Sequence, residues 1–148
     1  MRYLEDFAAG QTFGSGTVTV AEADIKAFAA AFDPQPFHLD DEAARTTLFQ
    51  GLAASGWHTA ALTMRLLVES DFAPAGGVVG AGAEDLRWPR PTRPGDTLRC
   101  ESEILEARPS AKRPEQGLLK VRTTTLNQRG EAVQILVANL LVPRRPPA

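Results

Sequence analysis

The sequence predicts a single α+β domain in which helices come first and antiparallel strands follow. Apolar residues recur at helical intervals in the first half, Gly76 and Gly77 separate the halves, and apolar and polar residues alternate in the second half. Helices followed by strands are typical of an α+β arrangement. With 148 residues, 43% of them hydrophobic, the chain is long enough for one core, and we expect residues 143–148 to form a flexible tail.

The first predicted helix covers about residues 21–32. Its apolar side chains recur at helical intervals, and a threonine and a glutamate have the spacing of a capping box at its start. The capping pair is Thr19 and Glu22, and the apolar series is Ile25, Phe28 and Phe32. Pro34 and Pro36 end the helix, because proline lacks the backbone N–H and moves the preceding residue out of the α region. A short helical turn is expected to restart at Asp40.

A second helix is predicted from Ser55 to about residue 68. Four apolar residues, Trp57, Ala61, Met64 and Val68, fall on one of its faces. So much small apolar surface indicates a helix that is wrapped by a sheet, and we expect this face to be buried in the core.

Strand patterns occupy the second half of the chain. Four runs combine β-branched residues with flanking turn residues: 78–88, 97–106, 118–126 and 132–142. Residues 127–130, between the last two runs, have the composition of a hairpin loop. In the run 118–126, apolar and β-branched residues alternate with polar ones, as in a sheet with one buried face. A short strand at residues 11–20 is expected to complete the sheet.

The composition excludes several classes of function. The formal net charge of −2 gives the molecule as a whole no attraction to nucleic acid or to an anionic membrane, and no apolar run suits a membrane span or a signal peptide. The single cysteine, Cys100, forms no intrachain disulfide, and neither a zinc-ligand spacing nor a Gly-x-Ser-x-Gly nucleophile motif is present. We therefore expect a soluble cytoplasmic protein without a metal and without nucleic-acid or membrane partners.

Basic residues concentrate in the second half of the chain, whereas the first half is acidic. The cluster of basic residues consists of Arg87, Arg90, Arg93, Arg99, Arg108, Lys112 and Arg113. Such a run indicates either a solvated face or a landing site for a phosphorylated ligand. The charge pattern alone leaves both interpretations open.

The segment most indicative of chemistry is Asp-Pro-Gln-Pro-Phe-His at residues 33–38. Two prolines in four residues make the segment stiff and extended, so Asp33 and His38 should have little conformational entropy left to lose. A carboxylate and an imidazole presented together suit proton transfer through a water molecule. The alternative is structural: Asp33 could cap a helix end or bond the loop backbone, and His38 could be a satisfied polar residue.

A second segment, Gly-Leu-Ala-Ala-Ser-Gly-Trp-His-Thr at residues 51–59, begins the second predicted helix. If Ser55 caps that helix, Gly56 lies in its first turn, with an unpaired N–H at the positive end of the helix dipole. That N–H is placed to stabilise an oxyanion, and the missing side chain lets a ligand approach. Gly56 could instead serve close packing, and His58 is expected to be structural or solvent-facing.

The two segments resemble those of MaoC-like dehydratases and R-specific enoyl-CoA hydratases, in the same order and at about the same separation. That family pairs an Asp-x-Asn-Pro-x-His-x-Asp loop with a helix-opening glycine. Here the loop is Asp-Pro-Gln-Pro-Phe-His-Leu-Asp at residues 33–40, and the helix begins with Ala-Ser-Gly-Trp at residues 54–57. A third likeness is Arg-Pro-Gly-Asp-Thr-Leu at residues 93–98, similar to a turn that enters a sheet strand in this family. The resemblance covers roughly residues 5–142.

The resemblance implies a hotdog fold, in which a long helix is wrapped by a curved antiparallel sheet, and a homodimer or higher homo-oligomer. It implies reversible hydration of a trans-2-enoyl-CoA to a 3-hydroxyacyl-CoA, with Asp33 and His38 as the catalytic pair and the Gly56 amide as the oxyanion donor. No cofactor is then expected, because the thioester itself acidifies C2. The residues expected to bind the acyl-CoA substrate are Ser55, Trp57, Arg87, Arg90 and Arg93, the arginines by contacting its phosphates.

Three positions depart from the family pattern. Gln35 stands where asparagine is common, Ser55 where many relatives have histidine, and Met64 about where some hydratases have a serine that holds the aspartate. Two other functions therefore remain open, a thioesterase of the same fold and a non-catalytic acyl-CoA-binding subunit. A thioesterase would release free thiol, whereas a non-catalytic subunit would bind ligand without turnover.

Overall fold

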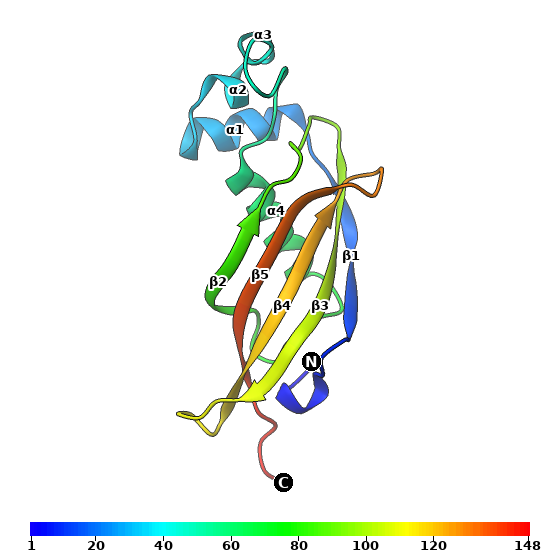
Figure 1. Cartoon of the computed structure of the whole chain (residues 1–148), viewed down its shortest axis with the longest axis vertical. Helices are drawn as coiled ribbons and strands as arrows, with labels where there is room; N and C mark the ends of the chain where they lie inside the picture. The colour runs from blue at the N-terminus through cyan, green and yellow to red at the C-terminus, as the bar shows by residue number, and fades with distance from the viewer.

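The computed structural model describes residues 1–148. In chain order its elements are a short 3₁₀ helix η1 (Leu4–Asp6), β1 (Thr12–Thr19), α1 (Glu22–Phe32), α2 (Pro36–Leu39), α3 (Asp41–Ala44), α4 (Gly56–Val68), β2 (Val79–Arg87), β3 (Thr97–Pro109), β4 (Gln116–Leu126) and β5 (Ala132–Pro143). Helices α1 to α3 gather at one end of the molecule, and both termini lie at the other end (Figure 1). None of these helices has the length and apolarity that crossing a membrane requires.

One five-stranded antiparallel sheet forms the body of the protein, in the order β1-β3-β4-β5-β2. The predicted α+β class is therefore confirmed, as are the strands of the second half and the loop that joins β4 to β5. The expected N-terminal strand is β1, at one edge of the sheet. Strand β2 forms the other edge, and most of its residues are exposed.

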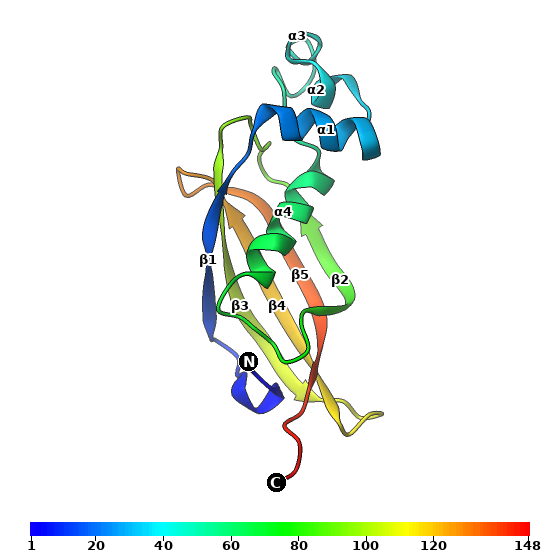
Figure 2. The same cartoon turned by 180° about the vertical axis from the view of Figure 1, so that it is seen from behind.

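Helix α4 crosses one face of the sheet, and the core lies between them (Figure 2). One apolar cluster joins η1 and the end of α4 to the central strands, through residues such as Leu4, Phe72 and Ile104. A second cluster contains Ile25 of α1 together with Leu52 and Ala54 from the segment before α4. Burial of this second cluster holds the start of α4 against α1, and so positions the end of the molecule that carries the reactive segments.

The buried face of α4 differs from the one predicted. Trp57, Met64 and Val68 are 59%, 44% and 57% exposed, and Ala61 is exposed as well. The buried side chains of the helix are instead His58, Thr59, Thr63, Leu66 and Leu67. The apolar stripe seen in the sequence therefore lies on the outer surface of this chain, and the prediction that it faces the sheet is wrong.

Polar side chains can take the buried face of α4 because each threonine hydroxyl has a partner. Thr59 Oγ1 donates to Thr92 Oγ1 at 3.0 Å, and Thr63 Oγ1 donates to the carbonyl oxygen of Thr59 at 2.8 Å. Satisfied in this way, a buried hydroxyl costs little. His58 is buried and stacks on Phe28 with ring centroids 4.8 Å apart, which agrees with the expected structural role.

Two local predictions in the N-terminal half are also corrected. The expected capping box is not formed, because the N-cap of α1 is Ala21, without a side-chain cap, and Thr19 ends β1. The segment after α1 is not extended throughout, because Pro36 begins the short helix α2, a position that proline favours. The restart at Asp40 is confirmed, since its side chain accepts the N–H of Glu42 and caps α3.

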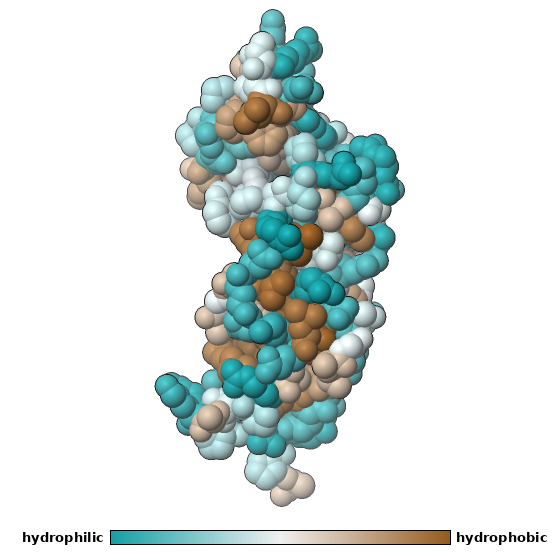
Figure 3. Space-filling view, viewed as in Figure 1, coloured by the Kyte–Doolittle hydropathy of each residue, from teal (hydrophilic) through white to brown (hydrophobic).

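The outer face of the sheet carries charged and apolar side chains side by side (Figure 3). Ion pairs join different strands there, such as Lys120 of β4 with Glu84 of β2 and Arg122 of β4 with Glu103 of β3, each at 3.2 Å. Exposed pairs of this kind contribute little to stability. The sheet is therefore held mainly by the backbone hydrogen bonds between its strands and by the apolar core on its inner face.

Candidate active site

Asp33 and His38 lie together at the end of the molecule where α1 to α3 gather. Asp33 directly follows α1, and His38 lies in α2. The intervening prolines turn the chain so that Asp33 Oδ2 lies 3.4 Å from His38 Nε2. Only 17% of the Asp33 side chain and 5% of the His38 side chain are exposed. The structure therefore brings the two predicted reactive groups together in a sheltered position.

Two hydrogen bonds hold the Asp33 carboxylate. The Gln35 amide donates to Oδ1 at 2.5 Å, and the Ser55 hydroxyl donates to Oδ2 at 2.7 Å. The bond from Gln35 is the main reason that the pKa of Asp33 lies below its ordinary value. The Ser55 bond and the charge of His38 also lower this pKa, whereas burial opposes them. Asp33 is therefore ionised at neutral pH.

Ser55 joins the reactive segment to the start of α4. Its fully buried Oγ accepts the N–H of Trp57 at 3.3 Å, as the N-cap of α4, while donating to Asp33. The helix cap agrees with the prediction, whereas the bond to Asp33, across 22 positions, has no local signal in the sequence. Ser55 thus holds the aspartate, and its expected contact with substrate stays a prediction.

His38 is oriented through its other ring nitrogen. Nδ1 lies 2.6 Å from the carbonyl oxygen of Ala53, and because a carbonyl only accepts, Nδ1 carries a proton and donates. Nε2 is therefore the nitrogen that faces Asp33. Phe37 and Phe49 pack against the imidazole, with ring centroids 4.6 Å and 5.6 Å away. The bond to Ala53 and the two aromatic contacts thus leave the ring little freedom to rotate.

Gly56 is the first residue of α4, and its N–H has no hydrogen-bond partner in the protein. The helix has 13 residues, and its dipole places partial positive charge at this end. A Cβ at position 56 would lie 2.6 Å from Cε2 of Trp88, whose indole packs against the glycine. The structure therefore shows both features that the sequence suggested here, a free donor and a close-packed neighbour.

A cavity of about 300 Å³ connects His38 with Gly56, and Asp33 lies beside it through its contact with His38. Its lining residues are His38, Phe49, Ala54, Gly56, Thr59, Trp88, Pro89, Arg90, Pro91 and Thr92. The other main hollows of the surface lie on the sheet or beside the termini, and they contact neither Asp33 nor His38. The imidazole of His38 and the first turn of α4 therefore share one cavity.

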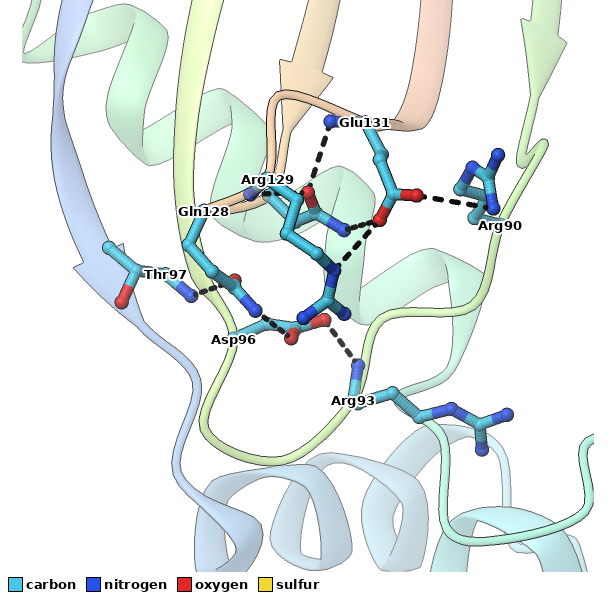
Figure 4. Close-up of polar contacts among 8 residues, drawn as sticks. Arg90, Arg93, Asp96, Thr97, Gln128, Arg129 and Glu131 are labelled. Atoms are coloured by element: carbon cyan, nitrogen blue, oxygen red, sulfur yellow. Dashed lines mark hydrogen bonds and ion pairs between the residues drawn. The ribbon is translucent and has the colours of Figure 1, made fainter.

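Among the three arginines expected to bind phosphate, Arg90 lines the cavity. It lies on the exposed rim, and its guanidinium pairs with Glu131, in the loop between β4 and β5, at 3.4 Å. Arg129 donates to the same carboxylate at 3.1 Å (Figure 4). Arg90 is thus the one of the three arginines that lies at the cavity, and its contact with a phosphate stays a prediction.

The other two arginines and Trp57 are engaged outside the cavity lining. The Arg93 guanidinium donates to carbonyl oxygens of the segment before α4, including Gly51 at 2.9 Å. Arg87 pairs with Asp85 at 2.9 Å on the edge strand β2. Trp57 is exposed and meets Trp88 edge-on, with ring centroids 5.3 Å apart. Their expected contacts with substrate stay predictions.

The Arg-Pro-Gly-Asp turn at residues 93–96 is held by the buried carboxylate of Asp96. This group accepts the backbone N–H of Arg93 at 2.8 Å and the side-chain amide of Gln128 at 3.0 Å, and Gln128 in turn accepts the N–H of Thr97 (Figure 4). Gly95 has a φ of +84°, which favours glycine. The turn is therefore tied to the loop between β4 and β5. This contact also fixes residues 88–92, the part of the cavity wall that directly precedes the turn.

Sequence reasoning missed the residues that complete the cavity. Trp88, Thr59 and Thr92 line it, and Gln134 accepts a hydrogen bond from the Trp88 indole. Trp88 stands at the end of a predicted strand, directly before Pro-Arg-Pro. A large aromatic residue at a strand end is the one local signal that could have indicated this part of the cavity wall.

The chain matches the family model of the MaoC like domain over residues 6–126. This protein belongs to the MaoC-like domain family. A MaoC-like dehydratase of solved structure, from Rhodospirillum rubrum, is 56% identical and superposes with a TM-score of 0.96, over 99% of this chain and 100% of that one. The similarity therefore covers the reactive segments and the sheet together.

Two curated relatives of this MaoC-like protein have named activities. The (R)-specific enoyl-CoA hydratase of Rhodospirillum rubrum is 29% identical over 98% of this chain and 94% of its own length. Mesaconyl-CoA hydratase of Cereibacter sphaeroides is 32% identical over 99% of this chain, which spans 43% of that protein. The fold is the hotdog fold that the resemblance implied, and the relatives support a family of hydratases and dehydratases.

Proposed function

We propose that this MaoC-like protein catalyses the reversible hydration of a trans-2-enoyl-CoA to a 3-hydroxyacyl-CoA. The observation that carries the proposal is the arrangement of three groups: the oriented imidazole of His38 and the free N–H of Gly56 border one cavity, and the ionised carboxylate of Asp33 lies 3.4 Å from that imidazole. Hydration of an enoyl thioester needs a base for water, an acid for C2 and a donor for the thioester oxygen. These three groups match those requirements.

In the proposed reaction one water molecule is activated between Asp33 Oδ2 and His38 Nε2, which lie 3.4 Å apart. As the water oxygen bonds to C3, the pair takes a proton from it and the C2–C3 π electrons move toward the thioester carbonyl. The N–H of Gly56 donates to the carbonyl oxygen as this atom gains charge. C2 then receives a proton from the pair, so the substrate gains the elements of water and the protein returns to its starting state. No cofactor takes part in this proposal, because the thioester acidifies C2.

A spectrophotometric assay tests the proposed function. Loss of the enoyl absorbance is followed over a series of enoyl-CoA substrates while free thiol is measured in parallel. We expect loss of absorbance without thiol release. Thiol release would identify a thioesterase instead, and ligand binding without either change would identify a non-catalytic subunit.

We propose further that the protein acts as a homo-oligomer, most simply a homodimer. The edge strand β2 has one side without a strand partner, and an unpaired edge favours pairing with another chain. The exposed apolar stripe of α4, which includes Trp57, Met64 and Val68, is the kind of surface that a second copy would cover. Light scattering measures the mass in solution, and the mass of a single chain would contradict this assembly.

Arg90 is expected to contribute to substrate affinity rather than to the chemical step. Arg90→Ala should raise KM about fivefold, equivalent to about 1 kcal/mol for an exposed ion pair, with kcat little changed. KM should also depend less on salt, because a charge contact is lost. Kinetics at two ionic strengths measure both effects.

The control is Arg108→Ala. Arg108 is an exposed arginine near the C-terminal end of β3, and it pairs with Glu106 at 3.5 Å. An unchanged KM for Arg90→Ala would show that Arg90 belongs to a solvated face.

Ser55 is expected to act as a positioning residue for Asp33. Ser55→Ala should lower kcat about tenfold, within the range caused by small displacements of a catalytic group. Because the lost hydrogen bond lowers the pKa of Asp33, its removal should raise that pKa and move the acidic limb of the pH–rate profile to higher pH. Loss of the helix cap should also cost about 1 kcal/mol of stability.

The pH–rate profile separates the positioning role of Ser55 from its cap, because a merely destabilised protein keeps the acidic limb in place. Ser70→Ala is the matched control, since the Ser70 hydroxyl bonds the carbonyl oxygen of Leu67 at the opposite end of the same helix. An acidic limb that stays in place in Ser55→Ala would limit Ser55 to capping α4.

A further inference from the structure

Trp88 forms the wall of the cavity that faces the start of α4. Three atoms of its indole would lie 2.6 to 2.8 Å from a Cβ at position 56, so the ring lies directly against Gly56. Trp57 meets the same ring edge-on, with ring centroids 5.3 Å apart. An acyl group whose thioester oxygen binds at the N–H of Gly56 therefore borders on the indole of Trp88.

Gln134 holds this indole from the sheet. Trp88 Nε1 donates to Gln134 Oε1 at 2.9 Å, and Gln134 lies on β5 with its side chain fully buried. The Nε2 atom of Gln134 has no hydrogen-bond partner. A buried donor without a partner destabilises a fold relative to an apolar residue of similar size. The loss of stability from the unpartnered Gln134 Nε2 occurs at the residue whose Oε1 holds Trp88. This indicates that Gln134 serves to orient the indole.

The inner end of the cavity is closed by a second hydrogen-bonded pair. Thr59 and Thr92 line the cavity, are each 2% exposed, and are joined at 3.0 Å. Behind them the Oγ1 atoms of Thr63 and Thr125, which are also buried, lie 2.6 Å apart. The core therefore offers no continuation for a long acyl chain. The exposed side of the cavity is formed by residues 88–91, with Trp88 itself 40% exposed, and the buried side, at Thr59 and Thr92, is left for the acyl group.

We propose that Trp88, fixed by Gln134, is the specificity-determining residue that limits the substrate to short acyl thioesters, an inference that rests on the proposed hydration. With the thioester oxygen at Gly56 and C3 at the Asp33–His38 pair, the atoms beyond C3 meet the indole and the closed end. A short enoyl group leaves this wall in place. A long one must displace the indole, which breaks its hydrogen bond to Gln134.

The preference for chain length tests the proposal, measured as the ratio of kcat/KM for crotonyl-CoA to that for trans-2-octenoyl-CoA. The wild-type ratio should be about 10² or more. Trp88→Leu should reduce it to less than about tenfold by raising the value for octenoyl-CoA. Gln134→Met keeps the indole but removes its acceptor, and should shift the ratio in the same direction. A wild-type protein that hydrates both substrates equally well, or a ratio unchanged in Trp88→Leu, would overturn the proposal.

The ratio separates a specificity role from a structural one, because a general loss of stability lowers activity on both substrates alike. Val79→Ala, at an exposed position of β2 outside the cavity, serves as the control and should keep the wild-type ratio. Melting curves of each variant accompany the kinetics.

Binding of butyryl-CoA and octanoyl-CoA, measured by calorimetry, probes the wall without turnover. The protein could lack hydratase activity and still bind butyryl-CoA more than about tenfold more tightly than octanoyl-CoA. If Trp88→Leu then abolished this difference, the result would refute the proposed function and support the length limit. Equal binding of both thioesters would overturn the length limit, and binding of neither would overturn both proposals.

Discussion

Asp33→Asn is expected to lower kcat for hydration by about 10²-fold or more, the lower range for a general acid–base group. The amide has the same size and can still accept a hydrogen bond from Ser55, but it carries no charge and takes no proton from water. His38→Ala should cause a loss of similar order, because it removes the ring nitrogen that faces Asp33 at 3.4 Å. Steady-state kinetics measure both losses, with melting curves to show that each variant is folded.

The two groups act on one water molecule in the proposed reaction, so their effects should not add. The double variant should lose little more than the worse single variant. Asp40→Asn is the matched control, because Asp40 caps α3 through a 3.0 Å bond from the N–H of Glu42, and asparagine caps equally well. Its kcat should stay normal. Near-normal turnover in either folded single variant would contradict the assignment of the pair.

Replacing Gly56 by proline is expected to lower kcat about 10²–10³-fold, the usual effect of losing one oxyanion donor. Proline lacks the N–H, and it is favoured at the first helical position, which Gly56 occupies. Ser55 already has φ −55° and ψ 140°, an extended conformation of the kind that a following proline requires. The proline ring would collide with the indole, so the substitution is made in a Trp88→Ala background.

The matched control is Gly56→Ala in the same Trp88→Ala background. Alanine adds a Cβ, as proline does, and it keeps the N–H. We expect its kcat to stay within about tenfold of the Trp88→Ala protein, whereas the proline variant falls by the larger factor. Equal kcat values for the alanine and proline variants would show that Gly56 serves packing alone. Melting curves reveal whether the proline variant has lost stability instead.

The order of the elements and the closeness of Asp33 to His38 were readable from the sequence because their signals are local. Alternation along a strand and the positions of proline and glycine act over a few residues. The strands of the second half, their hairpin loop and the helix after Ser55 therefore lie near their predicted bounds. Asp33 and His38 are close along the chain, so a short, proline-rich connection is enough to bring them together.

The environment of the reactive residues was decided by tertiary structure. Ser55 reaches Asp33 across 22 positions, and Trp88 reaches Gln134 across 46. Neither contact leaves a periodic pattern, because each depends on how the sheet and α4 place two distant segments. The pKa of Asp33 and the shape of the cavity follow from such contacts, and composition and spacing do not reveal them.

The sequence by itself determined that α4 forms and where it begins, since Ser55 caps it and Gly56 starts it. Which face of α4 is buried was decided by the fold. Periodicity indicated the side with Met64, but the side with Thr59 and Thr63 is the buried one. A buried hydroxyl is tolerated only where a partner is in reach, and the partner of Thr59 is Thr92, which follows β2. Only the folded chain brings that partner to the helix.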